Sequence, residues 1–263
     1  GVASVGDRRV AIGAFPIGIE GDAFAATAKG DEAQAMLARL RESQAGRRMI
    51  VGVDRLDYSK GLEERFLGYE KYLSDHPDMH THVVLVQIAP PSRGEVKSYQ
   101  EIRARLEAES GRINGRFAHT DWTPIRYVNK GYPRDRLAGI YRAAKVGLVT
   151  PLRDGMNLVA KEYVAAQDPK DPGVLILSRF AGAAMQLTEA LLINPYSDEE
   201  MADAIHQALT MPLEERKRRW KAMMEEIGET DVVWWRETYV GKLMQASDVE
   251  NAEDKLLELS DED

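Results

Sequence analysis

The sequence predicts an α/β fold: a Rossmann-like, doubly wound parallel sheet followed by trailing helices. Two observations predict it. Short apolar runs rich in β-branched residues recur between turn signals, and helix-like stretches lie between them. The apolar runs are continuous rather than alternating, which is typical of parallel strands covered on both faces. Regular alternation of strand and helix is typical of a doubly wound sheet.

The expected elements follow in chain order. Apolar runs bounded by turn signals predict strands at Val10–Ala14, Met49–Val53, Val83–Ile88, Ile125–Val128, Val146–Thr150, Val174–Leu177 and Leu191–Ile193. Apolar stripes such as Ala33, Met36, Leu37 and Leu40 predict helices at Glu32–Ala45, Leu62–Asp75, Val96–Ile113, Arg134–Ala143, Leu158–Ala166 and Ala181–Leu187. After Pro195 we expect helices only, at Asp198–Thr210, Leu213–Glu226 and Val232–Met244. Acidic residues in the first turn of Asp198–Thr210 suit a helix start.

The charge of the chain is unevenly distributed. The net charge is -8, but residues 247–263 hold eight acidic residues and one lysine. The remaining 34 basic and 35 acidic residues leave the rest of the chain close to neutral. A near-neutral body argues against nucleic-acid binding, which needs a basic face. We therefore predict one domain over residues 1–246 and an acidic, disordered tail over 247–263.

Composition excludes several other classes of protein. The absence of cysteine rules out disulfides, thiolate metal sites and a catalytic thiol. No apolar run approaches the roughly 20 residues needed to span a bilayer. The first ten residues lack the basic-then-apolar order of a secretory signal. The five histidines show no catalytic or metal-binding pattern. A cytoplasmic protein without membrane contact is the expectation.

The first candidate site segment is VGVDRLDYSKGL, residues 51–62, between a predicted strand and a predicted helix. Ligands of open α/β sheets bind at the carboxyl ends of strands, so this turn faces a crevice. Arg55 and Lys60 could converge on one anion, and a diphosphate suits a guanidinium fork beside a compact ammonium charge. The alternative is an ordinary loop in which these two cations pair with Asp54 and Asp57. The segment is not a G-x-G-x-x-G motif, so a nicotinamide cofactor has little support.

The second candidate segment is TPLRDGMNLVAKE, residues 150–162, again after a predicted strand. Gly155 permits a sharp turn, and Met156, Asn157 and Leu158 would present backbone N–H groups at a helix start, which favours an anion. Asp154 and Glu162, eight residues apart, could hydrogen-bond hydroxyls at separate points of one ligand. The alternative makes Asp154 a helix cap and Glu162 a partner of Lys161 or Arg153.

Two further turns follow predicted strands. The small residues of SRFAGAA, residues 178–184, would let backbone approach a ligand closely. Arg93, in the stiff turn APPSRG, could meet a second phosphate. All four turns would line one edge of the sheet, and this convergence favours a phosphate-bearing ligand.

The runs GVDRLDYSKGLEER, APPSRG, LVTPLRDGMNLVAKEYVAAQ and LSRFAGAA resemble those of the trehalose-6-phosphate synthases, the family 20 retaining glycosyltransferases. The resemblance covers roughly residues 8–245. It implies a glycosyltransferase type B fold, of which this sequence resembles the C-terminal, nucleotide-sugar-binding half. The N-terminal half with most acceptor contacts is then expected in the full protein, and this chain alone is expected to be inactive.

The resemblance also implies roles for individual residues. Arg55 and Lys60 would bind the donor diphosphate and stabilise it as it leaves. Asp154 would hydrogen-bond glucose hydroxyls, and Glu162 would hold the ribose. Three further contacts are implied: the donor backbone site (Gly155, Met156, Asn157, Leu158, Val159), the base (turn 129–132, with Tyr132) and the acceptor phosphate (Arg93). No metal or other cofactor is expected.

The implied reaction is transfer of glucose from a nucleoside diphosphate glucose, UDP-glucose above all, to glucose 6-phosphate with retention. Fixed cations would bind the leaving diphosphate most strongly in the transition state, which is the condition for catalysis. Three alternatives stay open: a glucosylglycerol-phosphate synthase, a pseudo-glycosyltransferase, and a non-catalytic module that binds nucleotide sugars. The nucleotide base and a homo-oligomeric state also stay open.

Overall fold

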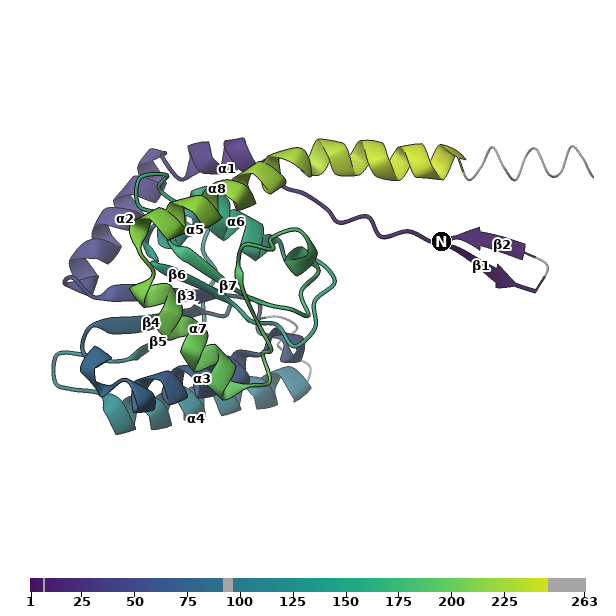
Figure 1. Cartoon of the computed structure of the whole chain (residues 1–263). Helices are drawn as coiled ribbons and strands as arrows, with labels where there is room; N and C mark the ends of the chain where they lie inside the picture. The colour runs from purple at the N-terminus through teal and green to yellow at the C-terminus, as the bar shows by residue number, and fades with distance from the viewer. Residues whose placement is uncertain (7, 92–96, 246–263) are drawn as a thin grey trace, which may run out of the picture.

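The structure is a computed structural model that describes residues 1–6, 8–91 and 97–245. At its centre lies a six-stranded parallel sheet with the strand order β5-β4-β3-β6-β7-β8 (Figure 1). The strands are β3 (Arg48–Val53), β4 (Val83–Ile88), β5 (Ile125–Val128), β6 (Val146–Val149), β7 (Val174–Ser178) and β8 (Leu191–Ile193). The order reverses between β3 and β6, so the sheet is doubly wound as predicted.

Helices cover both faces of the sheet, which explains the continuously apolar strands. One face packs against α2 (Asp31–Gln44), α5 (Arg134–Ala143) and α6 (Leu158–Ala166), with α1 (Gly21–Thr27) and α8 (Leu213–Glu229) adjoining. The other face packs against α3 (Leu62–Asp75), α4 (Lys97–Phe117) and α7 (Asp198–Thr210). Met49, Val51 and Val53 enter the first core, and Ile50 enters the second. Neighbouring side chains of one strand thus fill opposite cores.

The N-terminal part differs from the prediction. The expected sheet strand Val10–Ala14 is wrong: β2 (Arg8–Ala11) pairs only with β1 (Val2–Val5), antiparallel, in a separate two-stranded sheet (Figure 1). Val10 and Ile12 are exposed, so this apolar run lacks the covering that marks the central strands. Helix α1 was not predicted, because seven residues are too few for a clear periodic stripe.

The segment after β7 also departs from expectation. A helix was predicted over Ala181–Leu187, but the structure has a short 3₁₀ turn, η3 (Gly182–Met185). The amides of Gly182 and Ala183 donate to the carbonyl oxygens of Asp154 and Met156, at 2.9 and 2.8 Å. These amides bind a neighbouring loop, which fixes a turn in place of a helix.

The C-terminal helices follow the prediction closely. Ser197 caps α7 by accepting a hydrogen bond from the Glu200 amide at 3.1 Å. A last helix covers residues 232–245, and its Trp235 indole donates to the Phe15 carbonyl at 3.0 Å. The predicted acidic tail lies outside the described residues. Among the described helices, none has the length and apolar character that crossing a membrane requires.

Candidate active site

The loops that follow β3 and β6 meet at the carboxyl edge of the sheet, where the strand order reverses. Lys60 Nζ donates to Asp154 Oδ2 at 2.6 Å, although the two residues are 94 positions apart. Their side chains are only 16% and 15% exposed. Ligands of open α/β sheets bind in this crevice. The two candidate segments therefore form one site.

Backbone contacts hold these loops together. The Leu152 amide donates to the Ser59 carbonyl at 2.8 Å. Gly61 has a φ of 63°, and a Cβ there would overlap the Thr150 carbonyl oxygen. Only glycine combines this left-handed backbone with so close an approach. The contact between the loops thus depends on a residue without a side chain.

Arg55 is exposed, and the described residues give its side chain no hydrogen bond or ion pair. The alternative in which Arg55 and Lys60 pair with Asp54 and Asp57 is wrong. Asp54 binds Arg65, and Asp57 Oδ1 accepts hydrogen bonds from the amide and hydroxyl of Ser59 at 2.9 and 2.8 Å. Arg55 is therefore available to a ligand anion.

Arg65 supports the site, and sequence reasoning missed it. Its guanidinium is fully buried and contacts Asp54 Oδ2 at 2.6 Å, Gln87 Oε1 at 2.8 Å and Thr150 Oγ1 at 3.0 Å. These partners lie at or just beyond the carboxyl ends of three neighbouring strands. Burial raises the pKa of Asp54, and the attraction of Arg65 opposes that shift. The available signal was position: Arg65 lies on the buried stripe of α3 with Phe66.

The Asp154 loop is fixed from several sides. Its backbone bonds the segment after β7, from the Asp154 amide to the Phe180 carbonyl at 3.2 Å and from the Gly182 amide to the Asp154 carbonyl at 2.9 Å. Its carboxylate accepts hydrogen bonds from the Met156 amide at 3.3 Å and the Asn157 side chain at 3.2 Å. These bonds hold the carboxylate beside Lys60.

The cap of α6 is Asn157, so the alternative that assigns the cap to Asp154 is wrong. Asn157 has a φ of 82°, and its Oδ1 accepts a hydrogen bond from the Ala160 amide at 3.0 Å. The left-handed residue of this turn is thus Asn157, whereas Gly155 has an ordinary φ and open space around it. The amides of Leu158 and Val159 lie in the first turn, where N–H groups lack a partner within the helix.

Glu162 lies deeper on α6 and binds neither Lys161 nor Arg153, which overturns the alternative given for it. Its Oε2 accepts a hydrogen bond from the Tyr141 hydroxyl at 3.5 Å, and Arg134 Nε lies 3.9 Å from Oε1. Burial raises the pKa of Glu162. The carboxyl group is thus only weakly satisfied within the protein.

Lys161 has a structural role that the sequence did not reveal. It is 3% exposed and donates to the Ile17 carbonyl and to Gln186 Oε1, both at 2.8 Å. Burial lowers the pKa of its ammonium group. Lys161 holds the chain before α1 and the η3 region against α6.

The remaining candidate residues lie differently. Tyr132 is half-buried and packs against the apolar core. Arg93 lies outside the described residues. In the described part of the chain, no group of three or more His, Asp or Glu side chains is arranged to hold a metal ion.

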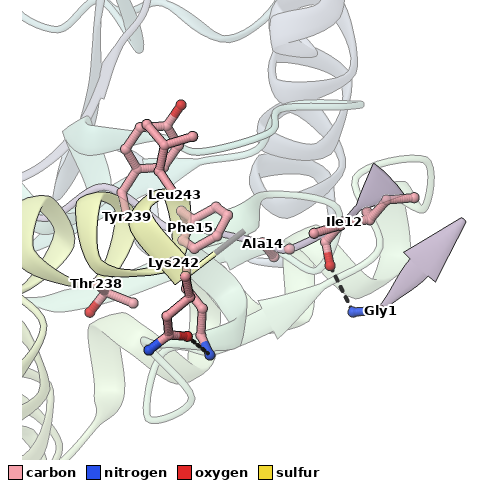
Figure 2. A pocket seen from close by; sticks show the side chains of 11 residues that line it. Gly1, Ile12, Ala14, Phe15, Thr238, Tyr239, Lys242 and Leu243 are labelled. Carbon is pink, nitrogen blue, oxygen red and sulfur yellow. Dashed lines mark hydrogen bonds between the residues drawn. The ribbon is translucent and has the colours of Figure 1, made fainter. Parts of the chain in front are cut away.

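A groove of about 620 Å³ lies apart from these loops, between residues 11–15 and the last helix (Figure 2). The rings of Phe15 and Tyr239 meet there edge to face, 5.2 Å apart. Among the described residues of its lining, Lys242 has the only charged side chain. The groove shares no residue with the β3 and β6 loops, so it is not part of the candidate active site.

Comparison with known proteins places this geometry in a family. The sequence profile of glycosyltransferase family 20 matches residues 1–245. The chain belongs to glycosyltransferase family 20. A trehalose-6-phosphate synthase from Enterobacter sp. is 54% identical over 233 residues, which cover 89% of this chain and 49% of that protein.

Solved structures agree with this family 20 assignment. A UDP-forming α,α-trehalose-phosphate synthase from Burkholderia xenovorans, in complex with glucose-6-phosphate, has a TM-score of 0.90 and 50% identity, covering 92% of this chain and 53% of that one. An E. coli structure bound with UDP-2-fluoro glucose has a TM-score of 0.85 and 52% identity, covering 88% and 51%. The chain spans about half the length of the relatives it matches. The family and the α/β fold predicted from sequence are confirmed.

Proposed function

We propose that this chain is the donor-binding half of a trehalose-6-phosphate synthase. The complete enzyme would transfer glucose from UDP-glucose to glucose 6-phosphate with retention. The observation that carries the proposal is the 2.6 Å contact between Lys60 and Asp154, which joins a cation and a carboxylate at the switch point of the sheet. Relatives near 50% identity, with UDP-2-fluoro glucose and with glucose-6-phosphate bound, support it.

In this proposal the diphosphate lies against Arg55 and Lys60. The amides of Leu158 and Val159 add a positive electrostatic field from the start of α6.

Other residues contact the remaining parts of the substrates. Asp154 accepts hydrogen bonds from glucose hydroxyls, and Glu162 holds the ribose. Tyr132 contacts the base, and Arg93 contacts the acceptor phosphate. These side chains and amides would thus contact different parts of the two substrates.

The proposed reaction breaks the bond between glucose C1 and the diphosphate oxygen and forms a bond from C1 to the acceptor oxygen on the same face. Negative charge grows on the leaving diphosphate, so Arg55 and Lys60 stabilise the transition state more than the ground state. The acceptor hydroxyl gives its proton to the leaving phosphate. No step needs a metal ion or a protein nucleophile.

The test is calorimetric titration of the chain with UDP. We expect saturable binding that Arg55→Ala and Lys60→Ala each weaken by about tenfold to a hundredfold, since each removes a charge-assisted hydrogen bond. Lys71→Ala is the matched control, because Lys71 pairs with Asp75 on the surface of α3. Absence of saturable binding, or equal affinity in all four proteins, would overturn the proposal.

A further inference from the structure

Two adjoining cavities lie at the amino edge of the sheet, opposite the candidate active site. Their volumes are about 430 and 270 Å³, and both are lined by Arg48 and Lys145. Arg48 begins β3, and Lys145 directly precedes β6. The loops of the candidate active site follow the far ends of these two strands. At about 3.3 Å per residue, β3 alone separates the two regions by roughly 20 Å.

Positive charge dominates the two cavities. Among the described residues, two carboxylates line them, Asp168 and Asp171. The described lining holds six cationic residues: Arg41, Arg47, Arg48, Arg142, Lys145 and Arg216. The chain up to residue 246 is close to neutral when these lining residues are counted with it. This local surplus of cations favours an anionic ligand.

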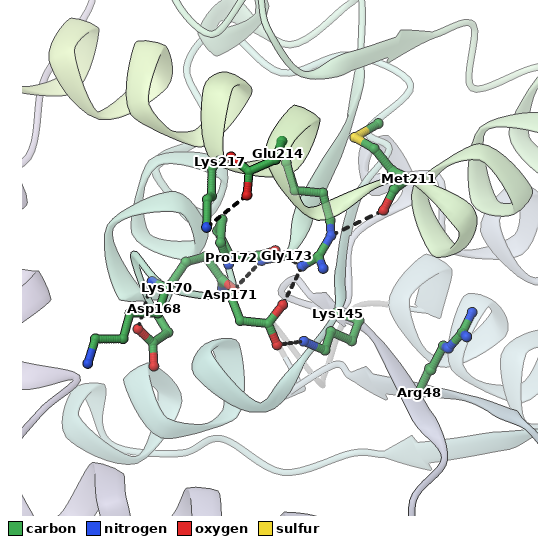
Figure 3. Close-up of polar contacts among 12 residues, drawn as sticks. Arg48, Lys145, Asp168, Lys170, Asp171, Pro172, Gly173, Met211, Glu214 and Lys217 are labelled. Atoms are coloured by element: carbon green, nitrogen blue, oxygen red, sulfur yellow. Dashed lines mark hydrogen bonds and ion pairs between the residues drawn. The ribbon is translucent and has the colours of Figure 1, made fainter.

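Both carboxylates already have partners within the protein. Lys145 binds Oδ2 of Asp171 (Figure 3). Arg216 binds Oδ1 of the same carboxylate at 2.6 Å. Arg142 lies 3.5 Å from Asp168. These contacts pair three of the cations with the two acids. Arg47 lies 3.4 Å from Asp121, which leaves Arg41 and Arg48 without a carboxylate partner among the described residues.

Arg48 is the cation best placed for a ligand. It is exposed, and Nη1 donates to the Leu209 carbonyl at 2.9 Å, near the end of α7. Within the described ranges it has no carboxylate partner. One bond to a carbonyl fixes the side chain but uses only one of five guanidinium N–H donors. Arg41, also exposed and without a carboxylate partner among the described residues, lines the adjoining cavity.

We propose that these cavities form a second binding site, for a small phosphorylated anion. The planar guanidinium of Arg48 matches two phosphate oxygens at once. Two adjoining cavities that share Arg48 and Lys145 suit a ligand with two negative groups. The proposal stands apart from the proposed function, because no residue of the candidate active site contributes to it.

Methyl NMR of methionine-labelled protein tests the proposal, with inorganic pyrophosphate as the probe. Met211 and Met49 line the two cavities, whereas Met156 lies in the Asp154 loop and reports on the candidate active site. Lys60→Ala is used as the background so that the first site is weakened. We expect saturable shifts of the Met49 and Met211 methyl signals in this background. Sodium sulfate at matched ionic strength controls for non-specific salt effects.

Arg48→Gln and Arg41→Gln are each expected to weaken this binding, Arg48→Gln by about tenfold or more. Lys217→Gln is the matched control, because it removes one charge from α8 outside either lining and Lys217 already pairs with Glu214 (Figure 3). The spectrum of each variant also shows whether it is folded. Shifts that do not saturate, that sulfate reproduces, that survive Arg48→Gln, or that occur at Met156 alone would overturn the proposal.

Discussion

Lys60 and Asp154 pair with each other in this structure, so under the proposed function a bound donor must separate them. A diphosphate would compete with Asp154 for the Lys60 ammonium group. Asp154 would then be free to accept hydrogen bonds from the sugar, while the amide of Met156 keeps it oriented. One ligand would thus replace this ion pair with two contacts, one from its diphosphate to Lys60 and one from its sugar to Asp154.

Glu162 gives a prediction about stability. Burial raises its pKa in the folded protein above the ordinary value of 4.5. Its contribution to stability is therefore fully present below about pH 4.5 and is lost as the pH rises through the folded-state pKa. We expect Glu162→Gln to have a free energy of unfolding roughly 0.5–2 kcal/mol above that of the parent chain near pH 8.

The measurement is urea unfolding of both proteins at about pH 4 and about pH 8, because only the difference between them isolates this residue. The gain should shrink toward zero at the lower pH. A variant that is less stable than the parent at the higher pH would contradict the assignment.

Sequence reasoning found the candidate site residues more readily than the residues that support them. It placed Lys60 and Asp154 at one edge because parallel strands end together. It could not choose between ligand binding and local pairing for Arg55, because that choice depends on which acid Arg65 binds. Arg65 was not predicted, because its partners Asp54, Gln87 and Thr150 follow from the folded structure and not from the sequence around it.

At the scale of elements, the contact between the β3 and β6 loops depends on Gly61 but not on Gly155. Gly61→Ala should destabilise the fold by about 2 kcal/mol or more, because it strains a left-handed backbone and overlaps the Thr150 carbonyl. Gly155→Ala is the matched control: its φ is ordinary, and nothing lies within 4 Å of an added Cβ. We expect it to change stability by less than about 0.5 kcal/mol.

Chemical unfolding of the two variants checks this difference, and titration with UDP follows on the folded proteins. Gly61→Ala should also weaken UDP binding, because it separates the loop of Lys60 from that of Asp154. Equal stabilities of the two variants would show that close packing of the loops is not what Gly61 provides.

The six strands of the central sheet could be predicted because each is largely apolar and bounded by turn residues. The run Val10–Ala14 is also apolar, yet only Val10 and Ala11 lie in a strand, β2 of the separate two-stranded sheet. The composition of an apolar run does not show whether helices will cover it in the folded protein. The predicted helix Ala181–Leu187 failed for a related reason: the amides of Gly182 and Ala183 bond across to the Asp154 loop, a contact that no local pattern encodes.

At the scale of the whole molecule, the proposed function makes this chain the donor-binding half of a larger enzyme. We expect it to bind UDP but to form trehalose 6-phosphate more than about a thousandfold more slowly than a full-length relative, since positioning of the acceptor is lost. Product assays with UDP-glucose and glucose 6-phosphate measure this. Turnover at the rate of the full-length relative would show that the acceptor site lies within this chain.

The most direct measurement is a crystal structure of the chain with UDP. The account predicts a diphosphate oxygen within about 3 Å of Lys60 Nζ, with Arg55 turned toward the same group and the contact between Lys60 and Asp154 lengthened. UDP bound elsewhere, or bound here with the ion pair between Lys60 and Asp154 intact and no phosphate contact, would contradict it.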